Sequence, residues 1–271
     1  KESIVCGWKL IKKNSIKYNT KLVPIDSEHF SISELIKKRK HEEIDKIYIT
    51  ASGGPFFKTN KSNFKNIKPI DAIKHPKWKM GKKISVDSAT LMNKVLELTE
   101  ALKLFSFKIN KFEIIIHPQS LIHAIVKFRN GTTYFLYHIP DMKIPISNAL
   151  LDSSFDYYKY FKNRYKNDML NQNLEFFPVD RKKFTTLSLI SKMNRSESSP
   201  IIINAANEIF VDEFLKNHIK FIDIFTYLNL VLKDKNYIKT SNMSCNSIKN
   251  IYKIDIWARE LAYKIIKKNT N

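Results

Sequence analysis

Two acidic side chains separated by one residue lie near the start of the chain. Asp26 and Glu28 stand in the sequence PIDSEHF, residues 24–30. In an extended segment, residues i and i+2 point to the same side, so both carboxylates would face one point. Such a pair suits Mg²⁺ or Mn²⁺, which prefer oxygen ligands. The alternative is a pair of solvated acids at the end of a strand.

A second group of polar side chains lies on the segment with the clearest helical pattern, residues 88–105. Asn93 and Glu97 are four residues apart and share a helix face, and Lys94 is adjacent. We expect Ser88 or its predecessor to cap this helix, where free N–H groups and the helix dipole favour a phosphate. Ser88, Asn93 and Lys94 are therefore a candidate phosphate site. An amphipathic helix with a serine cap explains them equally well.

Two loops also carry residues that could take part in chemistry. Ser52-Gly53-Gly54 offers a hydroxyl beside a backbone that allows close approach, or is simply a turn. The loop HPKWKMG, residues 75–81, could be a lid, or a loop that Trp78 anchors in the core. A lone histidine on a strand is more often structural than catalytic, and this applies to His117, His123 and His138.

The elements that must position these groups indicate a mixed or antiparallel sheet with a helix packed on it. Alternating apolar residues predict a strand at 44–51. Three further strands are expected at 112–117, 121–128 and 132–138, and Asn130-Gly131 predicts a two-residue hairpin between the last two.

The rest of the chain has weaker or more uniform patterns. We expect a short strand at 21–25 and a charged helical stretch at 33–46. Residues 151–184 have little periodicity and are interpreted as a connecting arm. From about residue 185 the pattern is helical to the end of the chain, with helices at 204–215 and 254–266.

Composition excludes several classes of protein. The 271 residues include 47 Lys and Arg against 26 Asp and Glu, a net charge of +21, but only six are Arg. Base-reading sites favour Arg, so a general excess of Lys, Ile and Asn indicates genome composition rather than nucleic-acid binding. Five glycines cannot form a glycine-rich nucleotide-binding loop. The two cysteines indicate no disulfide framework, and no apolar run predicts a membrane span.

Six motifs in order resemble one enzyme family. They are PIDSEHF, SGGPF, HPKWKMGKKISVDSATLMNKVLE, IHPQSLIHAIV, PDMKIPI and NAANEIF. Together they are similar to 1-deoxy-D-xylulose 5-phosphate reductoisomerase, an NADPH-dependent enzyme that makes 2-C-methyl-D-erythritol 4-phosphate for isoprenoid biosynthesis. The resemblance covers essentially the whole chain and is densest from Pro24 to Ile146.

The resemblance assigns roles to matching positions. It implies that Asp26, Glu28 and Glu97 are the carboxylates that bind Mg²⁺ or Mn²⁺, and that Glu2 and Gly81 contact NADPH. It also implies a catalytic role for Lys1, Glu28, His75 and Glu97. The residues that would bind substrate, including the flap residues Trp78 and Met80, are Lys1, Ser27, Glu28, Ser52, His75, Trp78, Met80, Ser88, Asn93, Lys94 and Glu97.

The resemblance also implies an organisation. The expected fold is α/β: an α+β catalytic domain with a mixed sheet and packed helices, followed by a C-terminal helical bundle. Residues 1–26 would end an NADPH-binding domain that is otherwise absent, residues 27–155 would form the catalytic domain, residues 156–190 an arm and residues 191–271 the helical domain. Such proteins are generally homodimers of the bacterial cytoplasm or of plastid-type organelles, with a sugar phosphate as substrate and no nucleic-acid or membrane partner.

The chain departs from the family pattern at a few places. Ala51 and Val95 replace glycines, residues 138–141 read HIPD rather than GEPD, and the asparagine usually found before Lys1 is missing. None of these changes removes an expected ligand. We expect this chain alone not to turn over, because most of the NADPH site would lie upstream. Two alternatives stay open: a metal-dependent phosphosugar isomerase without a reductase step, and a basic nucleic-acid-binding protein.

Overall fold

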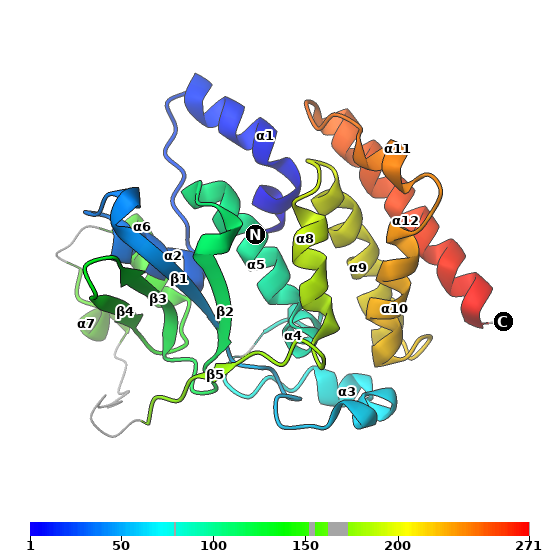
Figure 1. Cartoon of the computed structure of the whole chain (residues 1–271), viewed down its shortest axis with the longest axis horizontal. Coiled ribbons are helices and arrows are strands. Elements are labelled where there is room, and N and C mark those ends of the chain that lie inside the picture. Colours follow the sequence, from blue (N-terminus) through cyan, green and yellow to red (C-terminus); the bar gives the residue numbers. More distant parts are fainter. Residues whose placement is uncertain (79, 152–154, 162–172, 271) are drawn as a thin grey trace. The chain divides into compact units, whose positions relative to one another are not determined.

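The computed structural model describes residues 1–78, 80–151, 155–161 and 173–270 (Figure 1). The chain divides into two compact units. The helical unit comprises residues 1–21, 54–103 and 180–271, and the sheet unit comprises residues 22–53 and 104–179. Each unit is therefore assembled from segments that are far apart in sequence. The domain boundaries expected from the sequence stay a prediction.

The sheet unit contains a five-stranded mixed sheet with the strand order β4-β3-β1-β2-β5. Its central strand β1 pairs in parallel with β2 and antiparallel with β3, while β4 and β5 add to the two edges in antiparallel orientation. The expected mixed sheet is confirmed. The strands are β1 (Ile44–Ala51), β2 (Phe112–Ile116), β3 (Ile122–Phe128), β4 (Thr133–Tyr137) and β5 (Phe177–Pro178).

Helix α2 (Ser27–Ile36) packs on this sheet against β3 and β4. Its side chains Phe30 and Ile32 are buried, as are Ile47 and Ile49 of β1, which gives this unit its core. The other helical segments of the unit are α6 (Lys143–Leu150), α7 (Tyr157–Phe161) and the 3₁₀ turns η1 (His41–Glu43) and η3 (Ile109–Lys111).

The hairpin between β3 and β4 has a three-residue loop, 129–131, rather than the two-residue loop predicted. Gly131 N–H donates to Phe128 O at 3.1 Å, and Phe128 N–H donates to Thr132 O at 2.8 Å. Gly131 has φ +88°, the left-handed conformation that closes a type I turn with a bulge. The position of the hairpin was thus correct, and the extra residue reflects this turn type.

The helical unit is built around α9 (Ser199–Leu215), most of which is buried. Helices α12, α10, α1 and α4 contact it. The predicted helices at 204–215 and 254–266 are confirmed as parts of α9 and α12. The helical elements are α1 (Glu2–Lys17), η2 (Lys61–Asn66), α3 (Pro69–Ala72), α4 (Lys82–Thr90), α5 (Met92–Phe105), η5 (Thr185–Leu189), α8 (Ile190–Met193), α10 (Phe221–Leu232), α11 (Tyr237–Ser241) and α12 (Ile248–Thr270).

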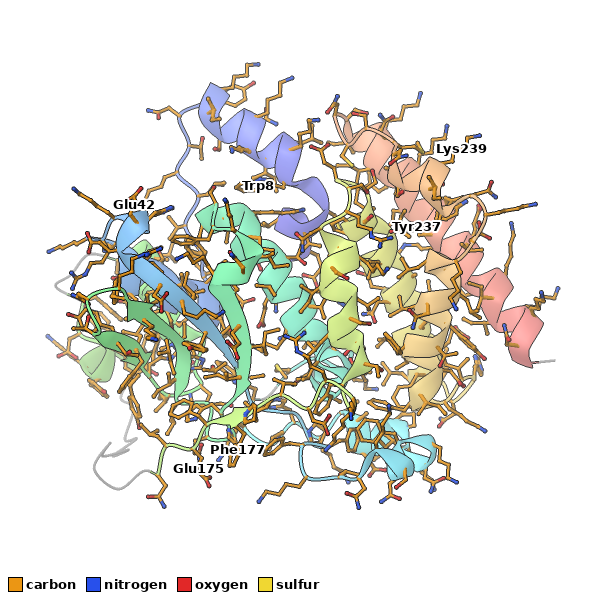
Figure 2. The ribbon with its side chains drawn as sticks, viewed as in Figure 1. Trp8, Glu42, Glu175, Phe177, Tyr237 and Lys239 are labelled. Atoms are coloured by element: carbon orange, nitrogen blue, oxygen red, sulfur yellow. The ribbon has the colours of Figure 1, made fainter. Side chains whose placement is uncertain are left out.

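The side chains of the helical unit follow the apolar stripes that the sequence shows. On α12, Ile254, Ala258 and Ala262 are fully buried. On the short helix α11, the Tyr237 hydroxyl contacts Ser199 Oγ at 3.0 Å, while Lys239 extends from the exposed side (Figure 2). None of the helices in the described residues is long and apolar enough to cross a membrane.

The expected single helix at 88–105 is wrong. Leu91 has φ +60°, which ends α4 and lets α5 begin at Met92. Asp87 and Ser88 consequently lie inside the last turns of α4 and cap no helix N-terminus. The sequence pattern could not reveal this break, because Leu91 is apolar and keeps the helical spacing of its neighbours.

Other expectations failed at element ends. The segment 21–25 is irregular rather than a strand, and Pro24 has no N–H for a ladder. The helical stretch predicted at 33–46 ends at Ile36, and β1 already begins at Ile44. The arm predicted at 151–184 contains α7 and β5, and its residues 152–154 and 162–172 lie outside the described residues.

Two residues with left-handed backbone should respond in opposite ways to glycine. Ser106 follows α5, is exposed and has φ +54°. Ser106→Gly should raise the free energy of unfolding by up to about 1 kcal/mol, since glycine adopts this conformation without strain. Leu91→Gly relieves similar strain but deletes a side chain that is 1% exposed, so it should lower stability by roughly 2 kcal/mol or more. Urea unfolding measures both, and equal signs would contradict this account.

Candidate active site

In the sheet unit, the acidic pair lies at the start of α2 rather than on an extended segment. Asp26 precedes the helix with φ −61° and ψ 136°, and Glu28 is in its first turn. One carboxylate oxygen of each lies within 4.8 Å of the other. The expected convergence of the two carboxylates is therefore found, although the predicted geometry was wrong. The positive end of the helix dipole favours both charges.

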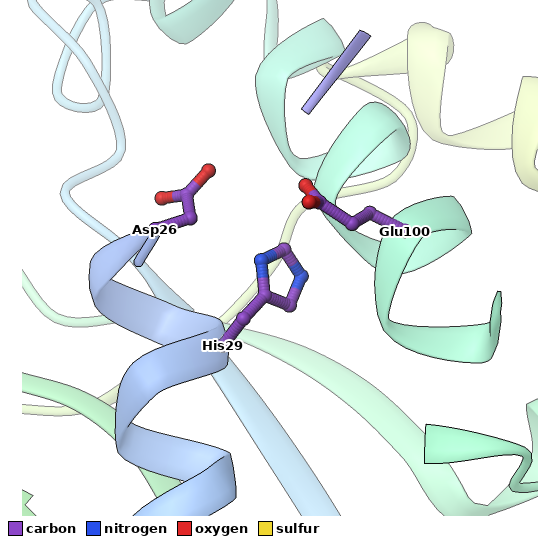
Figure 3. Close-up of side chains that lie close together, drawn as sticks. All are labelled: Asp26, His29 and Glu100. Carbon is purple, nitrogen blue, oxygen red and sulfur yellow. The ribbon is translucent and has the colours of Figure 1, made fainter. Parts of the chain in front are cut away.

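The neighbours of this pair complete an oxygen-rich group. Ser27 Oγ donates to Glu28 Oε2 at 2.6 Å, and both side chains are buried. His29, which sequence reasoning missed, also offers a ring nitrogen within 4.8 Å of Asp26. Figure 3 shows Asp26 just before α2 begins and His29 further along the helix, and it also labels Glu100 of α5. The helical spacing i, i+3 could have revealed His29, but only if the segment had been predicted as a helix.

In the helical unit, three polar side chains contact Glu97: two lie in the first turn of α5, and the third, Lys1, directly precedes α1. Asn93 Nδ2 donates to Glu97 Oε1 at 2.5 Å, as the i, i+4 spacing predicted. Lys94 Nζ donates to the other oxygen, Oε2. Lys1 Nζ lies 3.0 Å from Glu97 Oε1 and 2.7 Å from Asn93 Oδ1.

This cluster is a buried electrostatic unit. Glu97 is 1% exposed and Lys94 is 6% exposed. A buried carboxylate is tolerated only when it is paired and hydrogen-bonded, and here two ammonium groups and an amide meet it. The arrangement places two ammonium groups beside the carboxylate, and ammonium groups of this kind can also bind a phosphate.

Ser88 lies in the last turn of α4, three residues before the left-handed Leu91 that ends this helix. Its carbonyl accepts the Leu91 N–H at 3.1 Å, and its side chain is buried. Gly54 has φ +66°, and a Cβ there would lie 2.9 Å from Ser88 O. The glycine therefore allows the 54–57 turn to approach α4. Ser52 is half-buried in the sheet unit just after β1.

The loop before α4 carries the remaining substrate and cofactor candidates. His75 Nδ1 accepts the Trp78 N–H at 2.8 Å. Burial, together with the Lys94 charge, lowers the pKa of the His75 imidazole to about 4. Trp78 and Met80 are half-buried, so Trp78 does not anchor the loop as a fully buried core residue.

The two expected cofactor contacts lie at helix starts. Gly81 directly precedes α4, and Glu2 is in the first turn of α1. Glu2 Oε1 lies 3.1 Å from Lys83 Nζ. Of the three histidines predicted on strands, His123 lies on β3, while His117 and His138 directly follow β2 and β4. All three are engaged in packing: His123 and His138 stack at 3.9 Å between ring centroids, and His117 stacks on Phe176.

Comparison with known proteins identifies the family. A model described as "1-deoxy-D-xylulose 5-phosphate reductoisomerase C-terminal domain" matches residues 22–105, and one described as "DXP reductoisomerase C-terminal domain" matches residues 138–261. The 1-deoxy-D-xylulose 5-phosphate reductoisomerase of Pelagibacter ubique is 43% identical over 94% of this chain and 65% of its own length. That of Wolbachia from Brugia malayi is 41% identical over 98% of this chain and 67% of its own length. The chain belongs to the 1-deoxy-D-xylulose 5-phosphate reductoisomerase family.

Solved structures of this reductoisomerase family agree. A crystal structure of DOX-P reductoisomerase in complex with NADPH, fosmidomycin and magnesium has a TM-score of 0.86 at 32% identity, covering 98% of this chain and 68% of that one. The Zymomonas mobilis enzyme in complex with NADPH has a TM-score of 0.80 at 32% identity, covering 98% of this chain and 67% of that one. The chain thus spans about two thirds of the length of its relatives.

The glycine at position 54 should be far less replaceable than the one at 131. Both have positive φ, but nothing lies within 4 Å of a Cβ on Gly131. Gly131→Ala should therefore lower the free energy of unfolding by the backbone cost alone, roughly 1–2 kcal/mol. Gly54→Ala should cost more, because the backbone of α4 at Ser88 must also move. Denaturant unfolding of both variants tests this, and equal costs would contradict the close approach.

His75 should stay neutral over the physiological range. Its Nδ1 is a hydrogen-bond acceptor, so protonation would break the bond from Trp78. With an unfolded pKa near 6.5 and a folded pKa of about 4, its contribution to stability is complete above pH 6.5 and is lost as the pH falls toward 4. An NMR titration of the imidazole should give a midpoint near 4. A midpoint near 6.5 would contradict the burial of the ring and the acceptor role of its Nδ1.

Proposed function

We propose that the protein represented by this chain rearranges and reduces 1-deoxy-D-xylulose 5-phosphate to 2-C-methyl-D-erythritol 4-phosphate, with NADPH and a divalent metal. This step would serve isoprenoid biosynthesis. The observation that carries the proposal is the likeness to relatives of that name at 39–43% identity along nearly the whole chain. The buried Asn93–Lys94–Glu97 cluster supports it, because neither a nucleic-acid-binding surface nor an ordinary helix requires buried charges.

Asp26, Glu28 and Glu97 bind the divalent ion in this proposal. The donor set fits Mg²⁺ or Mn²⁺, since it consists of carboxylate oxygens. The closeness of Asp26 to Glu28 and the burial of Glu97 support the assignment. When bound, the ion would polarise the substrate carbonyl. Ser27 orients Glu28 by donating to its Oε2.

The substrate phosphate is held by hydroxyl, amide and ammonium groups. Ser52, Ser88, Asn93 and Lys94 supply these donors, and the Lys94 ammonium group, which also donates to Glu97, carries three N–H groups. Anchoring the phosphate away from the reacting carbons positions them for the rearrangement. His75, Trp78 and Met80 then close over the substrate as a flap.

The remaining roles concern the cofactor and the reacting oxygens. Glu2 and Gly81 contact NADPH, which supplies the hydride for the reduction. Lys1, held by Asn93 and Glu97, contacts the substrate as a cation near its oxygens. Lys1, Glu28, His75 and Glu97 are the proposed catalytic residues. A neutral His75 can take or give a hydrogen bond to a substrate hydroxyl without adding charge.

We propose a homodimer located in the bacterial cytoplasm, with no nucleic-acid or membrane partner. The edge strand β4 exposes Tyr134 and Phe135 at 40% and 44%, which supports its use as an interface. The named relatives come from bacteria.

Loss of a metal carboxylate should abolish activity in the full-length protein. Glu97→Gln and Asp26→Asn keep side-chain size but remove the charge, so kcat/KM should fall by roughly 100-fold or more even at saturating Mn²⁺. Glu34→Gln, on the exposed side of α2, is the matched control and should leave activity unchanged. NADPH oxidation followed at 340 nm, with circular dichroism to verify folding, measures the effect. Turnover by folded Glu97→Gln at the rate of the wild type would reject the assignment.

A further inference from the structure

Asp87 is a buried carboxylate that the proposed reaction does not use. It lies on α4 directly before Ser88 and is 1% exposed. Each of its two carboxylate oxygens contacts a side chain from a different helix. Asn207 Nδ2 of α9 donates to Oδ1 at 2.8 Å, and Lys83 Nζ of α4 lies 2.9 Å from Oδ2. A carboxylate buried in this way is costly unless such partners are kept.

Lys83 is bound on two sides. Besides Asp87, its ammonium contacts Glu2 Oε1 of α1 at 3.1 Å. Burial lowers the pKa of Lys83, but the carboxylates of Asp87 and Glu2 more than offset this, so its pKa lies above the usual value. Lys83 is therefore a cation shared between an exposed acid on α1 and a buried acid on α4.

Asn207 explains a motif that the proposed reaction leaves unused. It belongs to NAANEIF on α9, the central helix of the helical unit, and is fully buried. Its Oδ1 accepts no hydrogen bond from the described residues. The amide therefore acts as a donor to Asp87, and fixes the last turns of α4 against α9.

The consequence is a continuous connection between two proposed ligand contacts. Glu2 is the proposed NADPH contact, and Ser88 is a proposed phosphate contact. The path from one to the other runs through Lys83 and Asp87. A ligand that binds Glu2 would break its ion pair with Lys83 and so change the charge around Asp87. Asp87 directly precedes Ser88 in the chain. A purely structural salt bridge would have no such dependence.

We propose that Lys83, Asp87 and Asn207 form a positioning network that couples NADPH binding at Glu2 to phosphate binding at Ser88. The inference rests on the proposed function for the identity of the two ligands. None of the three residues is a catalytic residue. They act by holding α4, so their effect falls on how one ligand changes the affinity for the other.

The test is a coupling measurement on the full-length protein with inorganic phosphate as the probe. The dissociation constant of phosphate is measured by calorimetry with and without NADPH. In the wild type the ratio should differ from 1 by about 5-fold or more, the lower end of typical coupling. Lys83→Met should bring the ratio close to 1, and Lys83→Arg should restore most of it. Asp87→Asn, which keeps the volume and a partner for Asn207, should also reduce it.

A matched control and separate readouts make the result decisive. Arg259→Met removes another ion pair of the helical unit and should leave the ratio unchanged. Arg259 lies on α12 and contacts Glu208 of α9 at 2.5 Å and Asp255 of α12 at 2.6 Å. A ratio of 1 in the wild type, or a wild-type ratio in folded Lys83→Met and Asp87→Asn, would overturn the network. Failure of the wild type to oxidise NADPH with 1-deoxy-D-xylulose 5-phosphate would instead refute the proposed function, whatever the ratio.

Discussion

The left-handed backbone at Leu91 is the constraint on which the polar cluster of the helical unit depends. In a continuous helix, the directions of the Asn93, Lys94 and Glu97 side chains relative to Ser88 would be fixed by the helical rotation of 100° per residue. The break lets α5 start afresh and places its first polar side chains independently of α4. Thr186 Oγ1 donates to Thr90 O, which satisfies a carbonyl that the end of α4 leaves without a helical partner. A buried Leu91 side chain offsets the strain of the conformation.

Two buried carboxylates of the helical unit are each surrounded by cationic and amide side chains. Glu97 is buried with Asn93, Lys94 and Lys1 around it, and Asp87 is buried between Lys83 and Asn207. Both are carboxylates whose cost of burial is offset by cations on the same unit. The excess of lysine that raised the question of nucleic acid thus has a few buried members with a specific task. For the surface lysines, the interpretation stays that they reflect genome composition.

The sequence was informative where local spacing decides geometry. Glu97 and Asn93 are on one helix face, so their hydrogen bond follows from the i, i+4 rule, and β1 could be bounded correctly from its alternation. The sequence pattern was misleading where the backbone torsion of a single residue determines where a helix begins or ends. Leu91 hid a break inside a regular pattern, and Asp26 was assigned to an extended segment although it precedes a helix. His29 was missed for the same reason. Contacts such as Asn207 with Asp87, 120 residues apart, have no local signal at all.

Whether Glu97 is a metal ligand together with Asp26 and Glu28 is most directly tested by anomalous diffraction. Crystals of the full-length protein would be soaked in Mn²⁺ and data collected on both sides of the manganese absorption edge. The account predicts one strong anomalous peak at about 2.1 Å from an oxygen of each of the three carboxylates. A single peak bound by other side chains, with no oxygen of Glu97 within bonding distance of it, would contradict it.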